Sequence, residues 1–245
     1  MIRTFAAALF CVLSILFLLP WLILWTALTG DPEFMYSMAM KFVRFAVRVA
    51  GIRFRVEGRD NIPARGCVFA CNHVSNADSL VLVLAIPRRV SILAKRGVFR
   101  IPILAIGFRQ ASFVPVDRRA RESSVDLDAV AKLLKSGLSF LIFAEGTRSP
   151  DGRLRRFKKG AALMAIRAGA PVVPVAIAGT PRVMPKGDWR VHPGEVTVRF
   201  CLPIDASQYT VDRRPELVQR MQSAVAAALP PEQQPLARSA GDRPE

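Results

Sequence analysis

The sequence is poor in the residues that build several common kinds of site. Its 245 residues include two histidines, two tyrosines and four cysteines. Four cysteines, one of them inside an apolar N-terminal run, are too few for a disulfide framework. Cys67, Cys71 and His73 have the chemistry of metal ligands, but on a strand they share one face beside a core, and a fourth ligand is missing. We therefore expect buried thiols and no metal centre.

Acidic residues are also scarce. The chain has 19 Asp and Glu against 35 Lys and Arg, a formal net charge of +16. Such a charge predicts attraction to nucleic acid, an anionic membrane or phosphorylated substrates. The most basic run, residues 153–160, holds one aromatic residue, so the stacking platforms that bind single-stranded nucleic acid are absent. We expect no nucleic-acid partner and interpret the run as a patch facing anionic lipid or steering phosphate; a solvated loop is the alternative.

Charged residues are missing altogether from residues 5–28. As a helix, this stretch would extend about 36 Å, enough to cross a bilayer. A cleaved signal peptide fits less well, because the charged leader is Arg3 alone, the apolar run is long and no small-residue cleavage site follows. We predict a membrane anchor over residues 1–30, in which Pro20 leaves a re-entrant hairpin open as an alternative to a span.

Residues 31–51 predict a basic amphipathic helix. Lys41, Arg44 and Arg48 recur at helical spacing among Met, Phe, Val and Ala. A core helix with one solvated face has the same pattern, but the adjacent anchor favours a helix on the membrane surface that binds anionic lipids. The excess of basic residues after the anchor predicts a body on the cytoplasmic side of the cytoplasmic membrane.

Residues 52–229 predict an α/β domain with a mixed, largely parallel sheet flanked by helices. Short apolar runs alternate with helical patterns, as expected for that architecture. Strands are expected near 52–56, 67–72, 90–95, 111–117, 138–144, 171–177 and 195–202, and helices near 76–86, 120–136, 157–168 and 213–229. The polar, proline-rich residues 230–245 cannot bury much surface, so we expect a disordered tail.

Three polar loops follow predicted strands and begin at His73, Asp117 and Glu145. The ends of parallel strands lie on one edge of a sheet, so we expect these loops to form one pocket. His73 supplies an imidazole that can accept a proton near neutral pH. Asp78, five residues further on, is a candidate to orient it.

Four segments carry a stronger signal: Asn72-His73-x-x-x-x-Asp78, Phe113-Val114-Pro115-Val116-Asp117-Arg118, Phe143-Ala144-Glu145-Gly146-Thr147-Arg148-Ser149 and Val172-Val173-Pro174-Val175-Ala176-Ile177. In order and spacing they resemble the four motifs of the glycerolipid acyltransferase family, over about residues 60–205. The resemblance implies an enzyme of phospholipid biosynthesis without a metal or other cofactor. It would transfer a fatty acyl group from acyl-CoA or acyl-ACP to the free sn-2 hydroxyl of 1-acylglycerol-3-phosphate, giving phosphatidate.

The resemblance assigns His73 as the general base for the acceptor hydroxyl and Asp78 as the residue that orients its imidazole. A thioester donor is already activated, so a base worth roughly 10²- to 10⁴-fold in rate is the main requirement, and no covalent nucleophile is needed. Ser75 and Asp78 also match a capping box before an apolar run. Asp78 would then begin a helix, and the two roles can coexist.

The implied acceptor site comprises Arg118, Glu145, Gly146, Thr147 and Arg148. The two arginines resemble those that hold the acceptor phosphate in the family, since guanidinium groups match phosphate oxygens in a bidentate way. Because a carboxylate repels phosphate, we expect Glu145 to hold Arg148 or to accept a glycerol hydroxyl. Gly146 would let the backbone approach the ligand. Outside these motifs, either arginine would be interpreted as a solvated surface residue.

Lys95 ends a predicted strand in a segment similar to the lysine-containing segment between the family's first two motifs. It is a candidate to meet the phosphate or the developing oxyanion, with a solvated lysine as the alternative. Two residues depart from the family pattern. Ala144 replaces a common proline, which bears on loop rigidity, and Gly97 replaces a larger residue, which bears on acceptor preference.

Two other functions fit the same sequence. An enzyme of the same family could acylate another lysolipid, such as lyso-ornithine lipid or a lysophospholipid, with the same base and a different acceptor pocket. A non-catalytic basic protein that binds anionic membranes would release no thiol from acyl-CoA, and its binding would survive His73→Ala.

Overall fold

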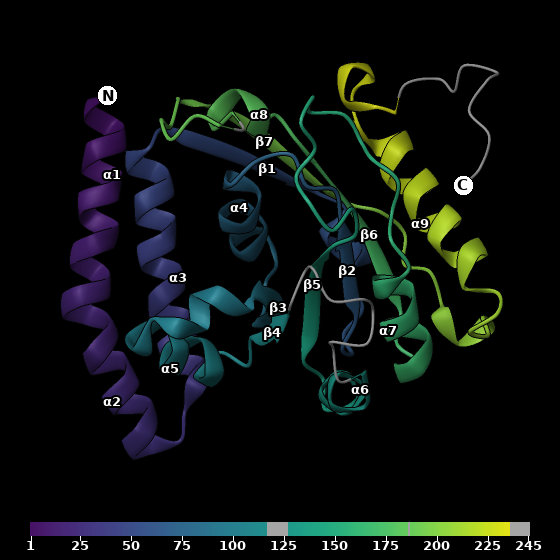
Figure 1. The fold of residues 1–245 in the computed structure, drawn as a ribbon, viewed down its shortest axis with the longest axis horizontal. Helices are drawn as coiled ribbons and strands as arrows, with labels where there is room; N and C mark the ends of the chain where they lie inside the picture. Colours follow the sequence, from purple (N-terminus) through teal and green to yellow (C-terminus); the bar gives the residue numbers. More distant parts are fainter. Residues whose placement is uncertain (117–126, 186, 236–245) are drawn as a thin grey trace.

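The centre of the molecule is a seven-stranded sheet with the order β1-β7-β6-β2-β5-β3-β4 (Figure 1). The computed structural model describes residues 1–116, 127–185 and 187–235. Neighbouring strands are parallel except for β6 and β7. This confirms the predicted mixed, largely parallel sheet. The strands are Ile52–Glu57 (β1), Val68–Cys71 (β2), Val90–Lys95 (β3), Val114–Val116 (β4), Ser139–Phe143 (β5), Val172–Ala178 (β6) and Gly194–Phe200 (β7).

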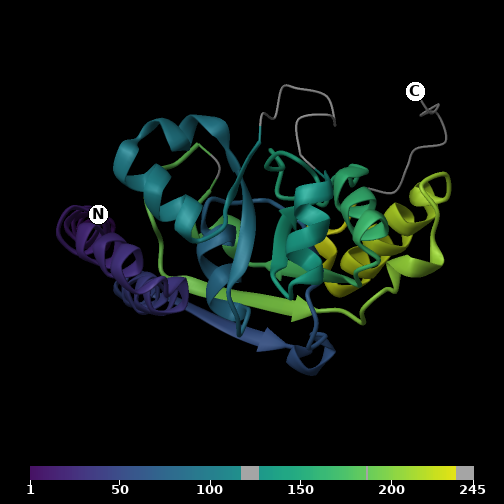
Figure 2. The same ribbon diagram turned by 90° about the horizontal axis from the view of Figure 1, so that it is seen from below.

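Helices cover both faces of the sheet, which confirms the α/β class (Figures 1 and 2). Core residues of α3 and α4 pack on one face, and those of α6, α7 and α9 pack on the other. The helices that follow the N-terminal segment are Pro32–Val49 (α3), Ala77–Ala85 (α4), Pro102–Gln110 (α5), Leu127–Lys135 (α6), Gly160–Ala168 (α7), Thr180–Val183 (α8) and Arg214–Ala228 (α9).

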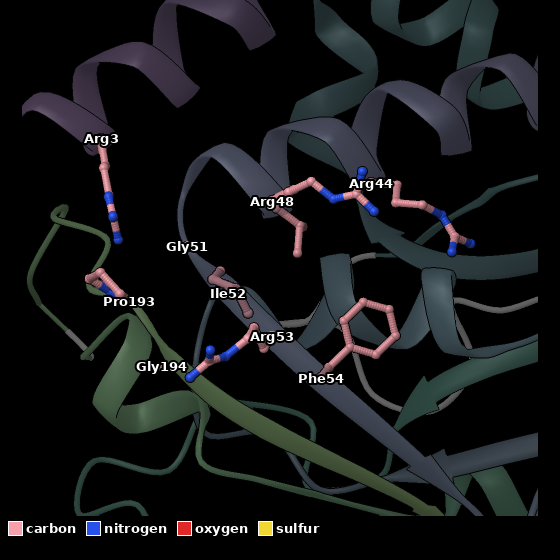
Figure 3. Close-up of a pocket in the computed structure, with 10 residues that line it drawn as sticks. Arg3, Arg44, Arg48, Gly51, Ile52, Arg53, Phe54, Pro193 and Gly194 are labelled. Atoms are coloured by element: carbon pink, nitrogen blue, oxygen red, sulfur yellow. The ribbon is translucent and has the colours of Figure 1, made fainter.

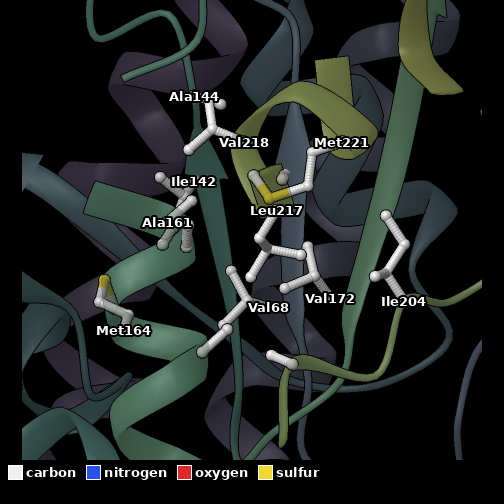
Figure 4. Packing of buried hydrophobic residues seen from close by; sticks show 14 of the residues in the cluster. Val68, Ile142, Ala144, Ala161, Met164, Val172, Ile204, Leu217, Val218 and Met221 are labelled. Atoms are coloured by element: carbon white, nitrogen blue, oxygen red, sulfur yellow. The ribbon is translucent and has the colours of Figure 1, made fainter. Parts of the chain in front are cut away.

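Strand β2 lies in the middle of these layers. Val68 and Ala70 face the core beneath α7 and α9, where Val68 lies close to Leu217 (Figure 4). The side chains of Cys67, Phe69 and Cys71 face the core beneath α3 and α4. All residues of β2 are fully buried, as expected for a central strand of a layered sheet. Both cysteine thiols therefore belong to the apolar core, as the sequence predicted.

The N-terminal segment is one continuous apolar helix, made of α1 (Ile2–Leu13), a π-helical turn (Ser14–Leu18) and α2 (Leu19–Thr29). Pro20 has no amide hydrogen and crowds the preceding turn, and the wider π turn lets the helix continue past it. The helix has 28 residues, and its most apolar stretch has a mean hydropathy of 2.7 and is 11% buried. By length and composition it is able to cross a membrane.

This helix lies along the flank of the α/β domain, as Figure 1 shows. Near its start, the Thr4 hydroxyl accepts a hydrogen bond from the Val191 amide at 3.1 Å. Near its end, the side-chain amide of Gln110 donates to the Ile23 carbonyl at 3.4 Å. Helix α3, the helix predicted over 31–51, returns beside it. Both ends of α1–α2 thus touch the domain, so the helix does not project away from it.

The helices of the α/β domain differ from the sequence predictions in two ways: α5 and α8 were not predicted, and α7 begins later than expected. Helix α5 was not predicted, because Gly107 interrupts its helical sequence pattern. A Cβ at this position would lie 3.3 Å from Leu19 of α2, so the glycine permits close packing of the two helices. Helix α7 begins at Gly160 instead of residue 157. The Lys158 amide donates to the Ala144 carbonyl at 2.7 Å, which keeps the preceding chain out of the helix. Of the helix predicted over 120–136, the structure describes the part from Leu127.

The start of the predicted disordered tail is ordered, which corrects the expectation for residues 230–235. Gln233 is 6% exposed, and its side-chain oxygen accepts a hydrogen bond from the Gly179 amide at 3.1 Å. Its backbone carbonyl accepts one from the Leu154 amide at 2.8 Å. These polar contacts fix the segment without the apolar burial on which the prediction relied. Residues 236–245 lie outside the described chain.

Candidate active site

The chain leaves β2 at a fixed point because Asn72 bonds to a neighbouring strand. Its side-chain amide donates to the Ile177 carbonyl at 2.9 Å, and its side-chain oxygen accepts from the Ile177 amide at 2.8 Å. Ile177 belongs to β6, so a side chain continues the backbone pairing of the sheet by one more residue. Sequence reasoning gave Asn72 no role beyond ending the strand. His73 follows directly and inherits this fixed position.

The His73 imidazole is held on one edge and one face. Its Nδ1 lies 2.8 Å from Oδ2 of Asp78, and its ring stacks on Phe143 with centroids 3.8 Å apart and planes at 18°. The side chain is 8% exposed. A carboxylate at Nδ1 favours the tautomer with the hydrogen on that nitrogen, which leaves Nε2 as the proton acceptor. Nε2 has no partner in the part of the chain that the structure describes.

Asp78 is fully buried, and the protein compensates its charge locally. Besides the imidazole, Oδ2 accepts hydrogen bonds from the backbone amides of Val74 at 2.7 Å and Ser75 at 2.8 Å. Asp78 also lies in the first turn of α4, where the helix dipole favours a negative charge. Three donors to Oδ2 and the helix terminus offset part of the cost of burying the carboxylate, whose Oδ1 is buried without a partner among the described residues.

The capping interpretation of Asp78 also holds in the structure. Its carboxylate reaches back to the Ser75 amide, while the Ser75 hydroxyl accepts from the Ala77 amide at 3.1 Å and donates to the Met184 carbonyl at 2.8 Å. The same oxygen that bonds the imidazole therefore also fixes the start of α4. Capping and orientation are one arrangement, as the sequence allowed.

The loop after β5 holds the backbone of His73 from both sides. Glu145 Oε1 accepts a hydrogen bond from the His73 amide at 2.8 Å, and the Ser149 amide donates to the His73 carbonyl at 2.8 Å. Strands β2 and β5 are parallel neighbours, which is why their following loops meet. The predicted convergence is confirmed for these two loops. The first residue of the other loop, Asp117, lies outside the described residues.

Glu145 takes a position that the motif did not reveal. Its second oxygen, Oε2, accepts from the Arg155 amide at 3.3 Å, so both oxygens meet backbone amides. The side chain is buried, and burial raises the pKa of Glu145 to about 7, against the lowering effect of the hydrogen bonds from His73 and Arg155. Near neutral pH a large share of this carboxyl is uncharged, so it would repel a nearby anion less than an ionised carboxylate does.

A lysine side chain crosses the loop after β5 at its glycine. Gly146 has φ +74°, and a Cβ there would lie 2.9 Å from Cδ and Cε and 3.1 Å from Nζ of Lys158. The absent side chain thus leaves room for Lys158, whose ammonium comes to lie beside the loop. The sequence indicated Lys158 only as one of five charges in the run 153–160. Its separation of twelve residues from Gly146 gave no local signal.

The remaining predicted site residues divide by location. Thr147 is exposed and Arg148 half-buried, and both continue the loop that holds His73. The backbone of Lys95 ends β3, beside β5 in the sheet. Arg118 lies outside the described residues.

Among the described residues, the arrangement has the parts of a base, and no serine hydroxyl is positioned beside the imidazole as a nucleophile. The serine hydroxyls nearest in sequence to the two loops are committed elsewhere, that of Ser75 to the Met184 carbonyl and that of Ser149 to Asp151 Oδ1 at 2.7 Å. No hydroxyl or thiol in the described residues bonds to the imidazole of His73. A buried His–Asp pair of this kind can remove a proton from an external hydroxyl.

Comparison with known proteins identifies the class. The sequence profile of the Acyltransferase family matches residues 53–178, which is 126 of 245 residues and spans the site. The chain therefore belongs to the Acyltransferase family, a family of enzymes. This confirms the resemblance carried by the four motifs.

Individual relatives are more specific. The 1-acyl-sn-glycerol-3-phosphate acyltransferase of Limnanthes douglasii is 31% identical over 190 residues, covering 77% of this chain and 67% of the plant protein. The protein of the same name from Pseudomonas aeruginosa is 32% identical over 169 residues, covering 66% of this chain and 64% of its own length. The crystal structure of the 1-acyl-sn-glycerophosphate (LPA) acyltransferase PlsC from Thermotoga maritima superposes with a TM-score of 0.81 at 28% identity, covering 93% of each chain.

Proposed function

We propose that the protein transfers a fatty acyl group from an acyl-CoA or acyl-ACP thioester to the sn-2 hydroxyl of 1-acylglycerol-3-phosphate, forming phosphatidate. One observation carries the proposal: His73 is held by Asp78 and Phe143 on its side chain and by Glu145 and Ser149 on its backbone. Such preorganisation fits a base whose nitrogen must meet a substrate hydroxyl at hydrogen-bond distance. The names of the relatives support the choice of acceptor.

The reaction is a direct transfer. His73 Nε2 takes the proton of the acceptor hydroxyl while the hydroxyl oxygen forms a bond to the thioester carbonyl carbon. The tetrahedral oxyanion then collapses, the carbon–sulfur bond breaks, and the leaving thiolate receives the proton from the imidazolium. The products are the ester and a free thiol, so the enzyme is restored without a cofactor. The ionised Asp78 stabilises the imidazolium that forms between the two proton transfers.

The acceptor phosphate needs cations on the same side of the sheet. Arg148 follows Glu145 and Gly146 in the loop that holds His73, and we assign it and Arg118 to the phosphate oxygens. Lys158 adds an ammonium beside Gly146. Charge-assisted bonds of about 1.5 to 3 kcal/mol each would supply much of the acceptor binding. Lys95 and Thr147 complete the proposed acceptor site.

The N-terminal helix supports membrane association. Its 28 residues are about 42 Å long, longer than a hydrocarbon core of about 30 Å. Because both ends touch the α/β domain at Val191 and Gln110, a full crossing would carry part of that domain into the bilayer. We propose that α1–α2 is immersed lengthwise in one leaflet, with the domain on the cytoplasmic face of the membrane.

The function is tested with the full chain purified in detergent. Acyl-CoA is offered with 1-acylglycerol-3-phosphate, lyso-ornithine lipid or a lysophosphatidylcholine, and thiol release and lipid products are measured. We expect the fastest turnover with 1-acylglycerol-3-phosphate and phosphatidate as its product. Faster turnover of a lysolipid without a phosphomonoester would reassign the acceptor. No acceptor-dependent thiol release from any lysolipid would instead favour a non-catalytic membrane protein.

Arg148→Ala separates phosphate recognition from the chemistry. We expect a raised KM for 1-acylglycerol-3-phosphate and a smaller change for acceptors that lack the phosphomonoester. Arg55→Ala is the matched control, because Arg55 is an exposed arginine on β1, at the far edge of the sheet. If Arg148→Ala leaves KM and turnover as they are in the Arg55→Ala protein, the phosphate assignment is wrong.

A further inference from the structure

Four arginines line an open cavity of about 670 Å³ where α1, α3, β1 and β7 meet. None of the residues that form the His73 site is part of its lining. Arg3 comes from α1, Arg44 and Arg48 from successive turns of α3, and Arg53 from β1 (Figure 3). We call it the arginine cavity. The remaining lining residues are Val47, Gly51, Ile52, Phe54, Pro193 and Gly194.

The fold places Arg3 in this cavity. The Thr4 hydroxyl bonds to Val191, which fixes the start of α1 against the loop that leads to Pro193. A Cβ on Gly51 would lie 2.6 Å from a guanidinium nitrogen of Arg3, so the glycine provides the space that this side chain occupies. Figure 3 shows Arg3 pointing toward Pro193 and Arg53 extending toward Gly194. Tertiary contacts thus bring Arg3 to the cavity that Arg44, Arg48 and Arg53 line from a single stretch of the chain.

The positive charge of the cavity is poorly balanced. No carboxylate is among the described residues that line it. Glu195 pairs with Arg53 at 3.2 Å, but both side chains are about four-fifths exposed, so solvent screens this pair. Several guanidinium groups around one hollow attract an anion, and their planar geometry matches the oxygens of a phosphoryl group.

Along α1 and α3 the surface near the arginine cavity is apolar, whereas Arg44 and Arg53 also line neighbouring polar hollows. A second hollow of about 370 Å³ lies on the α1–α3 pair, lined by Phe10, Met38, Phe42 and Phe45, with Lys41 among them. Thirteen of the twenty exposed large apolar side chains of the described chain lie in residues 1–29. An anion bound in the cavity therefore sits beside surfaces suited to acyl chains, a combination that a phospholipid matches and a soluble phosphate does not.

We propose that the arginine cavity binds the phosphoryl headgroup of an anionic phospholipid in the membrane that holds the enzyme. This site is separate from the acceptor site and does not depend on the proposed reaction. Its chemistry is shared by soluble phosphates, including those of CoA, so the test must distinguish the two sources.

The test compares the partitioning of the full-length protein into two kinds of vesicle: phosphatidylcholine alone, and phosphatidylcholine with one fifth phosphatidylglycerol. The partition coefficient with phosphatidylglycerol is divided by the coefficient without it, and in this ratio the apolar contribution of α1–α2 cancels. We expect Arg44→Gln/Arg48→Gln to lower this ratio by about fivefold for each arginine removed. The control Lys132→Gln/Lys135→Gln removes two exposed charges from α6, on a different part of the molecule, and should change it by less than about twofold.

A conservative pair distinguishes a built site from diffuse charge. Arg44→Lys/Arg48→Lys keeps the net charge but loses the planar donors, so we expect the ratio to fall several-fold. A ratio equal to that of the unaltered protein would mean that surface charge alone acts and would overturn the proposal. The substituted side chains, Arg44, Arg48, Lys132 and Lys135, are all exposed. Thermal unfolding in detergent checks that each variant is folded.

The soluble source is tested by adding CoA or inorganic phosphate to the phosphatidylglycerol vesicles, with sodium chloride at equal ionic strength as the control. We expect the partition ratio to match the sodium chloride control. If CoA or phosphate displaces the unaltered protein from the vesicles but has no such effect on Arg44→Gln/Arg48→Gln, the cavity binds a soluble phosphate and the lipid proposal is overturned.

Discussion

The described residues include two histidine–aspartate pairs, one in the loop after β2 and one in the loop before β7. In the first, His73 Nδ1 lies 2.8 Å from Asp78 Oδ2, and the side chains are 8% and 0% exposed. In the second, His192 Nε2 lies 3.7 Å from Asp188 Oδ2, and the side chains are 48% and 31% exposed. The residue types are the same, so the surroundings decide what each pair can do.

The surroundings differ most in how the backbone is used. Asp78 binds two amides at the start of α4, and the amide and carbonyl of His73 are held by the loop after β5. Asp188 is engaged in its own turn, where a hydrogen bond from the Arg190 amide lowers the pKa of Asp188. We therefore expect that a nearby carboxylate alone does not make a histidine a catalytic base. The distinguishing features are burial and fixed backbone on both partners.

The largest expected difference between the two pairs is in turnover. His73→Ala should lower the rate of acyl transfer roughly 10²- to 10⁴-fold, because the proton acceptor is removed. His192→Ala should stay within about twofold of the unaltered enzyme. Both rates are measured as acceptor-dependent thiol release at saturating acyl-CoA. Equal rates for the two variants would break the comparison and the mechanism with it.

The two aspartates should differ in stability as well as rate. Asp78→Asn replaces a buried charge that accepts three hydrogen bonds, so we expect a loss of about 3 kcal/mol in the free energy of unfolding together with a large loss of turnover. Asp188→Asn, in its own exposed turn, should leave the free energy of unfolding close to that of the unaltered protein. Urea unfolding followed by circular dichroism measures both. A stable, active Asp78→Asn protein would show that the carboxylate neither orients the base nor fixes α4.

Glu145 links the site to pH. Its pKa rises from about 4.5 to about 7 on folding, so between these values the folded state retains a proton that the unfolded chain has lost. The retained proton stabilises the folded state fully below pH 4.5. This stabilisation, up to about 3 kcal/mol in the free energy of unfolding, is lost as the pH rises from 4.5 through about 7. Unfolding measured from pH 4.5 to 8 should show this fall reduced in Glu145→Gln. The same pH slope in both proteins would mean that Glu145 is charged throughout.

The smallest expected effect concerns Gly146 and Lys158. Gly146→Ala forces a side chain into a positive φ and into the space of Lys158, and we expect a loss of about 1 kcal/mol in the free energy of unfolding. The end of a lysine can move, so backbone strain should account for most of the loss. Adding Gly146→Ala to the Lys158→Ala protein should then cost nearly the same free energy of unfolding as adding Gly146→Ala to the unaltered protein. Complete recovery would assign the loss to crowding instead.

Much of this arrangement is local enough to be predicted from sequence. The seven strands follow from short apolar runs, and His73 and Asp78 stand out because polar residues directly follow such a run. The atoms that Glu145 meets could not be predicted, because they belong to His73, 72 residues away, and to Arg155. For the same reason the ordering of Gln233 escaped prediction, since it depends on polar contacts with Gly179 and Leu154.

The N-terminal helix illustrates the same limit on a larger scale. Its length and apolarity follow directly from the sequence. Its direction relative to the domain depends on contacts with Val191 and Gln110, which lie far along the chain. The proposal that the helix is immersed in one leaflet therefore rests on the tertiary structure and not on the sequence. The arginine cavity is likewise formed by residues far apart in the chain, from Arg3 to Gly194.

The most direct test of the central claim, that His73 acts on the acceptor hydroxyl and not on a nucleophile of the protein, omits the acceptor. The enzyme is mixed with a small excess of acyl-CoA labelled in the acyl group, and thiol release and labelled protein are followed through the first turnover. Direct transfer predicts no burst of thiol until 1-acylglycerol-3-phosphate is added, and no labelled protein at any time. One equivalent of thiol released per enzyme, with the acyl label bound covalently to the chain, would contradict it.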